Sequence, residues 1–129
     1  MMKQAPRILV CDDDRTIQTV IRTLLEAEGF RVLTARNALE GIGLARREKP
    51  DLILMDILMP DLDGTMASDL LRDIPEFASI PVVFLSALPR EEIVERVRET
   101  GAVGFLEKPF RRRQLLEVVS RWAGQPATA

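Results

Sequence analysis

Short apolar runs alternate along this chain with longer segments in which apolar residues recur every three or four positions. Short uninterrupted runs are typical of buried strands, and the wider spacing is typical of helices that bury one face. The segments expected to form strands are residues 8–11, 30–35, 51–56, 80–86 and 103–107. Because predicted strands alternate with predicted helices, the pattern favours βαβ units and a parallel sheet over a sandwich or a helical bundle.

The helix boundaries are marked by capping residues. Asp13 or Asp14 is expected to cap the first helix, whose buried face carries the apolar residues 17, 20, 21, 24 and 25. Asn37 followed by Glu40 resembles a capping box for the second helix, which stops before Pro50. The remaining helices are expected from residue 64 to about 71, over 91–100, and around the buried face formed by Leu115, Val118, Val119 and Trp122.

Length and composition indicate one compact domain. The chain has 129 residues, of which 47% are hydrophobic and 29% charged, so we expect a single domain over 1–129, with 125–129 a tail or the start of a linker. The net charge of −2 argues against nucleic-acid binding. The basic run 111–113 lies in the first turn of the last helix, where we expect it to form a face exposed to solvent. A membrane span and a signal peptide are both lacking, so a cytoplasmic location is expected.

Two residue types limit the chemistry. Histidine is absent, which excludes Ser-His-Asp and Cys-His catalysis, histidine metal ligation and a phosphohistidine on this chain itself. The single cysteine, Cys11, lies inside an apolar strand, where a packed and inert thiol is expected.

Polar side chains stand where the predicted strands end. Asp12 and Asp13 follow the first strand, Asp56 ends the third, Ser86 ends the fourth, and Lys108 follows the fifth. The carboxyl ends of parallel strands open onto one crevice, which is the usual ligand site of a doubly wound α/β fold. We therefore expect three acids, one hydroxyl and one ammonium group to converge.

These groups suit phosphoryl chemistry. Adjacent carboxylates repel one another unless a cation neutralises them, and carboxylate oxygens suit a hard divalent ion such as Mg²⁺. An aspartate beside Mg²⁺ can attack phosphorus and form an aspartyl phosphate. The transferred group also needs a cation and a hydrogen-bond donor on its oxygens, which Lys108 and Ser86 supply. The pattern predicts a phosphoryl-acceptor site.

The segments 8–14, 55–64, 84–87 and 105–110 resemble, in order and spacing, the receiver domain of two-component response regulators, of the chemotaxis-regulator type. The resemblance implies a flavodoxin-like α/β fold: (βα)5, doubly wound, with a five-stranded parallel sheet in the order 2-1-3-4-5 and helices on both faces. It implies that Asp56 accepts a phosphoryl group from a phosphohistidine on a sensor histidine kinase or phosphotransfer protein. It also implies that Asp12, Asp13, Asp56 and the backbone carbonyl of Leu58 bind Mg²⁺, or Mn²⁺ in its place.

The resemblance further implies a switch. Lys108 would pair with Asp56 or its phosphate, Ser86 would turn inward to bond it, and Phe105 would change rotamer with the hydroxyl. The peptide Lys108-Pro109 would be cis. The fourth helix, last strand and last helix would form the output surface for a partner protein or domain, and a homodimer that forms on phosphorylation is a further expectation. The chain would be no enzyme beyond its own phosphotransfer and autodephosphorylation.

Two positions bear on how long the phosphoryl group survives. Leu58 and Leu88 occupy variable positions that, in receivers, flank the path of the hydrolytic water. Because apolar side chains cannot orient that water, we expect a phosphoryl state that lasts minutes or longer.

Three other functions remain open at this point. Asp12, Asp14 and Thr16 also fit the nucleophile motif of haloacid-dehalogenase-type phosphatases, although the acidic motif expected after Lys108 is missing and Asp56 would have no role. A flavodoxin-like cofactor carrier would need a glycine- or hydroxyl-rich loop after the first strand, which is absent. A docking module that never takes phosphate is the last alternative. The sequence does not identify a kinase, an output partner or a pathway.

Overall fold

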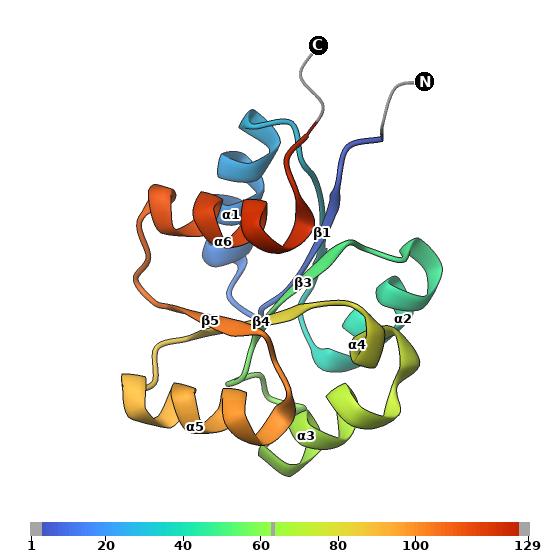
Figure 1. The fold of residues 1–129 in the computed structure, drawn as a ribbon, viewed down its shortest axis with the longest axis vertical. Coiled ribbons are helices and arrows are strands. Elements are labelled where there is room, and N and C mark those ends of the chain that lie inside the picture. Colours follow the sequence, from blue (N-terminus) through green and yellow to red (C-terminus); the bar gives the residue numbers. More distant parts are fainter. Residues whose placement is uncertain (1–3, 63, 127–129) are drawn as a thin grey trace.

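Five parallel strands form one sheet at the centre of the computed structural model, which describes residues 4–62 and 64–126 (Figure 1). The strands are β1 (Arg7–Cys11), β2 (Arg31–Ala35), β3 (Leu52–Asp56), β4 (Val82–Ser86) and β5 (Gly104–Glu107). Their order is β2-β1-β3-β4-β5, and every neighbouring pair is parallel. The predicted fold class and strand order are therefore confirmed.

The helices cover both faces of the sheet. They are α1 (Arg15–Ala27), α2 (Ala38–Glu48), α3 (Gly64–Asp73), α4 (Pro75–Ser79), α5 (Arg90–Thr100) and α6 (Arg112–Ala123). Figure 1 shows α1 and α6 together on one face and the other helices on the opposite face. The short helix α4 was not predicted. It is separate from α3 because Pro75 cannot continue a helix but is well suited to the first turn of a new one.

The caps of the first two helices agree with the predictions, with two differences. Asp14, and not Asp13, caps α1: its carboxylate accepts hydrogen bonds from two backbone N–H groups at 2.8 and 3.4 Å. Asn37 caps α2 by accepting from the N–H of Glu40 at 2.8 Å. The second half of the predicted capping box is absent, because the Glu40 carboxylate pairs instead with the Arg36 guanidinium at 2.8 Å.

Two apolar layers hold the helices to the sheet. In β1, alternate residues belong to opposite layers: Ile8 packs toward α1 and α6, while Leu9 packs toward the other helices. All residues of β3 and β4 are buried, as expected of central strands covered on both faces. Val20 and Trp122, predicted on buried helix faces, are 41% and 37% exposed. Val20 lies at the margin of its apolar stripe, whereas Trp122 lies in the last turn of α6, where it lines an open cavity.

None of the helices in the described part of the chain is long and apolar enough to span a membrane.

Candidate functional site

Polar side chains gather at the carboxyl edge of the sheet. Asp12 follows β1, Asp56 ends β3, Ser86 ends β4, and Lys108 follows β5, and these four strands are neighbours. Among the described residues, the buried polar side chains are Asp12, Asp56 and Ser86, which are 0%, 5% and 0% exposed. Asp13 is exposed beside them. The residues predicted from the strand ends therefore lie together.

The ammonium group of Lys108 joins two of the carboxylates. Its Nζ lies 2.9 Å from Oδ2 of Asp56, the predicted partner, and 2.6 Å from Oδ2 of Asp12. The second contact was not predicted. Asp12 and Lys108 are 96 positions apart, and only the order of the strands brings the long lysine side chain within reach of both acids. Lys108 is thus the shared counterion of β1 and β3.

The same type of side-chain-to-backbone hydrogen bond orients the groups at three strand ends. Each of three side chains accepts a hydrogen bond from the backbone N–H two residues further along, a local turn typical of Asp and Ser. The three bonds run from Asp14 to Asp12 Oδ1 at 2.9 Å, from Leu58 to Asp56 Oδ1 at 2.8 Å, and from Leu88 to Ser86 Oγ at 2.9 Å. In both aspartates one oxygen is thus bonded to the loop, and the other faces Lys108.

The charges of the site are not fully balanced. Burial raises the pKa of Asp12 above its ordinary value, although the hydrogen bond from Lys108 opposes that effect. Burial by itself lowers the pKa of Lys108, but its hydrogen bonds with Asp12 and Asp56 outweigh burial and raise that pKa. Lys108 therefore remains charged at neutral pH. A site with one cation beside three acids favours a further positive charge.

The three acids could hold that charge as a metal ion. One carboxylate oxygen from each of Asp12, Asp13 and Asp56 lies within 4.8 Å of the other two. Oxygen ligands of this kind suit a hard cation that keeps several waters, and the chain has no histidine to attract softer metals. The donor set is consistent with a Mg²⁺ site.

The remaining predicted residues lie in the loops after β3 and β4, in β5 and just after it. Leu58, next to the turn of Asp56, is 52% exposed, and Leu88 is half-buried beyond Ser86. Phe105 is half-buried in β5, with the guanidinium carbon of Arg90 5.4 Å from its ring centroid. The peptide Lys108-Pro109 is cis.

The cysteine and the basic run lie outside this centre. Cys11 is buried, and burial followed by the charge of Asp12 raises the pKa of its thiol to about 12, which agrees with an inert thiol. Within the basic run at the start of α6, Arg112 pairs with Glu28 and Arg113 lies 3.8 Å from Glu117. These pairings fit the solvated face expected for the run.

Sequence reasoning missed a further acid at this edge. The carboxylate of Asp61, in the loop after β3, accepts hydrogen bonds from the backbone N–H groups of Ala38 and Leu39 at 3.0 and 3.2 Å. It therefore ties the loop that follows Asp56 to the start of α2. No local motif signals this contact, because its partners lie more than 20 positions away.

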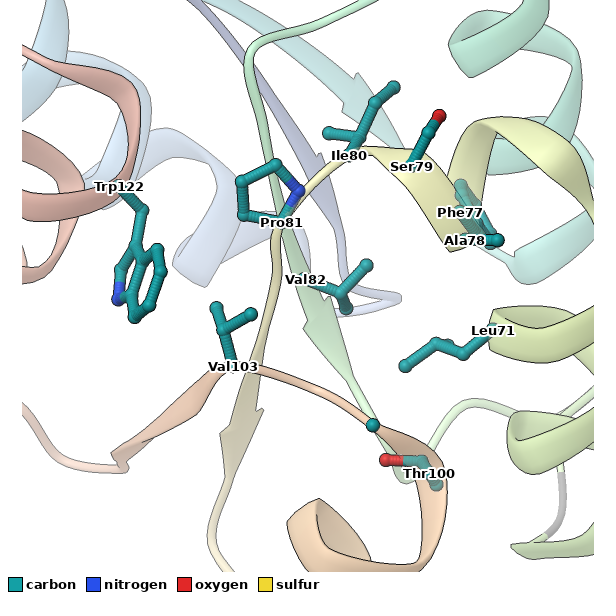
Figure 2. Close-up of a pocket in the computed structure, with 11 residues that line it drawn as sticks. Leu71, Phe77, Ala78, Ser79, Ile80, Pro81, Val82, Thr100, Val103 and Trp122 are labelled. Carbon is teal, nitrogen blue, oxygen red and sulfur yellow. The ribbon is translucent and has the colours of Figure 1, made fainter.

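A cavity of about 360 Å³ lies at the opposite, amino edge of the sheet. It is bounded by Pro81, just before β4, and by Val103, just before β5. Figure 2 shows the indole of Trp122 on one side of it and Leu71 and Phe77 on the other. None of the described residues that line this cavity is ionisable, so it shares neither place nor chemistry with the acidic centre.

Comparisons with known proteins agree with this geometry. Residues 8–120 match the response regulator receiver domain. The polar-differentiation response regulator DivK of Brucella anthropi is 32% identical over 117 residues, which cover 91% of this chain and 95% of that protein. A response regulator is not a classical enzyme, so the phosphatase alternative finds no support.

Solved structures show the same architecture. The chemotaxis protein CheY4 of Vibrio cholerae superposes with a TM-score of 0.82 at 26% identity, covering 92% of this chain and 98% of that one. The receiver domain of the sensor histidine kinase PA1611 of Pseudomonas aeruginosa has a TM-score of 0.81 at 31% identity, covers 94% and 99%, and holds a magnesium ion in its active-site cleft. This chain therefore belongs to the response regulator receiver domain family, and its aspartate cluster with Lys108 is typical of a phosphoaspartate site.

Proposed function

We propose that this chain relays a two-component signal by accepting a phosphoryl group on Asp56. The observation that carries the proposal is the position of Lys108 Nζ, which contacts Oδ2 of both Asp12 and Asp56 beside the exposed carboxylate of Asp13. A cation fixed between a buried acid and a strand-end acid neutralises the charge that phosphoryl transfer concentrates there.

Asp56 is the best acceptor among the three acids. It ends β3, the strand next to β4, so Ser86 at the end of β4 and Lys108 after β5 lie on the same side of it in the strand order. Its Oδ1 is held by the N–H of Leu58, which orients the carboxylate. Asp12 follows β1, which is not a neighbour of β4, and is fully buried. The position of Asp56 next to β4 thus favours it as the nucleophile.

The same proposal assigns Mg²⁺, or Mn²⁺ in its place, to the acidic cluster. Asp12, Asp13 and Asp56 would hold the ion with the backbone carbonyl of Leu58. The donor set supports this assignment, as does the magnesium ion in the related kinase receiver. When bound, the ion would neutralise charge on the carboxylates and on the incoming phosphoryl oxygens.

The transfer itself needs little covalent chemistry from the protein. A carboxylate oxygen of Asp56 forms a bond to phosphorus while the bond between phosphorus and the donor's imidazole nitrogen breaks, and the freed imidazole leaves with the donor protein. Lys108 stays charged and donates to the new phosphoryl oxygens. The Ser86 hydroxyl donates a hydrogen bond to the same phosphoryl oxygens. Membership in the receiver family implies a histidine kinase as the partner, either directly or through a phosphotransfer protein.

Phosphorylation would then shift a conformational equilibrium. The new charge and acceptors at Asp56 favour states in which Ser86 and Lys108 contact them, and Phe105 follows the hydroxyl. The surface formed by α5, β5 and α6 would present the result to an output protein or domain, or to a second copy of the chain. A cytoplasmic location remains part of this proposal, as expected from the sequence.

Reset would be slow. Leu58 and Leu88 place apolar side chains on the two loops beside Asp56, where neither can orient a water molecule for attack on phosphorus. Loss of the phosphoryl group would therefore take minutes or longer without a phosphatase.

Labelling with acetyl phosphate tests the whole proposal. Wild type should take up one phosphoryl group in Mg²⁺, lose the label over minutes, and take up none in EDTA. Asp56→Asn should abolish labelling, and Asp13→Asn should weaken it by raising the Mg²⁺ concentration required. Labelling that survives Asp56→Asn would contradict the assignment, and release of the label within seconds would contradict slow reset. Unchanged spectra on adding beryllofluoride with Mg²⁺ would point to a docking module that takes no phosphate.

A further inference from the structure

Arg90, the first residue of α5, is attached to β5 by two contacts. Its Nη1 lies 3.0 Å from Oε1 of Glu107, and its guanidinium carbon lies 5.4 Å from the ring centroid of Phe105. Phe105 and Glu107 are two positions apart in a strand, so their side chains leave β5 on the same side. One guanidinium therefore engages both an aromatic face and a carboxylate on one face of the strand.

The segment between Ser86 and Arg90 is short and conformationally restricted. Ser86 Oγ is bonded to the N–H of Leu88 at 2.9 Å, so the hydroxyl and the loop move together. Pro89 follows with φ at −56°, which its ring fixes. A shift of the Ser86 hydroxyl is thus transmitted to Arg90 over a short and stiff connection.

The other side of the contact leads to the second sensing residue. Glu107 is directly followed by Lys108, and the N–H of Lys108 donates to the carbonyl of Ser86 at 2.7 Å. Arg90 therefore closes a small ring that contains the loop after β4, the end of β5 and both groups that would contact a phosphoryl group on Asp56.

We propose that Arg90 is a positioning residue that restrains the switch: its contacts with Glu107 and Phe105 hold the loop after β4 against β5 and favour the unphosphorylated state. The inference rests on the proposed function, because it assumes that Ser86 moves toward a phosphoryl group on Asp56. That movement draws the loop and Arg90 away from β5, so the contacts of Arg90 oppose it. By thermodynamic linkage, any group that favours one state weakens ligands that favour the other.

The restraint is small because its members are exposed. The side chains of Arg90 and Glu107 are 69% and 43% exposed, and exposed ion pairs and cation–π contacts contribute little individually. Removal of Arg90 should therefore tighten the binding of a phosphoryl mimic about fivefold, the size expected from the two weak contacts together. Arg90 would tune the switch without locking it.

The test measures the affinity of beryllofluoride in Mg²⁺ by NMR titration, for wild type, Arg90→Ala, Glu107→Ala and Arg90→Lys. The matched control is Arg98→Ala, because Arg98 lies on the same helix and is similarly exposed, but its ion pair, with Glu95, stays within α5. Both alanine variants should bind the mimic more tightly and be labelled faster by acetyl phosphate. Arg90→Lys should lie between them and wild type, since lysine keeps the charge but not the planar stacking. Arg98→Ala should match wild type.

The outcomes separate this inference from the proposed function. A wild type that neither binds beryllofluoride nor takes label would overturn both. A wild type that responds, with Arg90→Ala and Glu107→Ala unchanged or weaker in affinity, would overturn the restraint alone. The signals of the Phe105 ring supply a readout that general destabilisation would not mimic: in the folded, mimic-free Arg90→Ala protein they should shift toward their positions in the bound wild type. Urea unfolding of each variant checks that only folded protein is compared.

Discussion

The two edges of the same sheet have opposite characters. At the carboxyl edge, Asp12 and Asp56 are buried with a single ammonium group, that of Lys108, between them. At the amino edge, an open cavity is lined by Phe77, Trp122 and other residues, none of them ionisable (Figure 2). The same strands run through both edges, so the difference lies in the side chains placed where each strand begins and ends.

The chain uses one edge of the sheet mainly for stability and the other for chemistry. Apolar groups at the amino edge stabilise the fold in proportion to the area that they remove from water. The acids at the carboxyl edge are held in a setting that raises the pKa of Asp12, which means that keeping it ionised opposes folding. The fold tolerates the cost of burying Asp12 because its contact with Lys108 offsets part of that cost and because the rest of the sheet is well packed.

The strongest destabilisation should follow a substitution at the amino edge. Phe77, in α4, is 2% exposed and packs in the layer opposite α1 and α6. Replacing it with alanine should lower the free energy of unfolding by about 3–4 kcal/mol, measured by urea denaturation. Labelling of the folded protein by acetyl phosphate should stay at the wild-type rate, since no ionisable group is disturbed.

Phe77→Leu is the control for that change, because it keeps most of the apolar volume and should cost less than Phe77→Ala. A labelling rate that falls with stability across the two variants, under conditions where both are folded, would show that the two edges are coupled.

The next effect has the opposite sign and belongs to the carboxyl edge. Asp12→Asn removes a buried negative charge but keeps an oxygen that can accept from the N–H of Asp14. Without divalent ions it should raise the free energy of unfolding, because burial raises the pKa of Asp12 and keeping this carboxylate ionised therefore opposes folding.

Magnesium supplies the control for that variant. Added Mg²⁺ should raise the melting temperature of the wild type and have little effect on Asp12→Asn, because ligand binding stabilises only a protein that binds the ligand. A variant that is less stable than wild type in EDTA would show that the contact with Lys108 outweighs the cost of burying Asp12, and that this edge is not destabilised.

A smaller change in stability is expected at Asp61, which lies at the same edge as Asp12. Asp61 carries no proposed chemistry, and its carboxylate accepts hydrogen bonds from the first N–H groups of α2. Asp61→Ala should lower the free energy of unfolding by about 1 kcal/mol, the usual cost of losing a helix cap. Asp61→Asn, which keeps one acceptor, should recover part of it. Stabilisation by Asp61→Ala would mean that repulsion among the acids reaches this loop and exceeds the benefit of the cap.

Much of the fold could be predicted because its signals are local. Apolar runs, periodic spacing and caps lie within a few residues of one another, and they predicted the five strands, five of the six helices in the described part of the chain and the gathering of strand-end residues. The helix α4 escaped prediction because its five residues, Pro75–Ser79, are too few for a periodic pattern to emerge. Residues 127–129, in the predicted tail, lie outside the described part, and the single-domain boundary 1–129 stays a prediction.

Short-range patterns are enough to assign chemical groups to the ends of the strands, because neighbouring residues mark where each strand stops. How those groups contact one another depends instead on long-range packing. Lys108 lies between Asp12 and Asp56, Asp61 caps a helix that precedes it, and Arg90 joins the loop after β4 to β5. Each of these contacts depends on strand order and register, and therefore on the packing of the whole sheet, which no short segment of the sequence specifies.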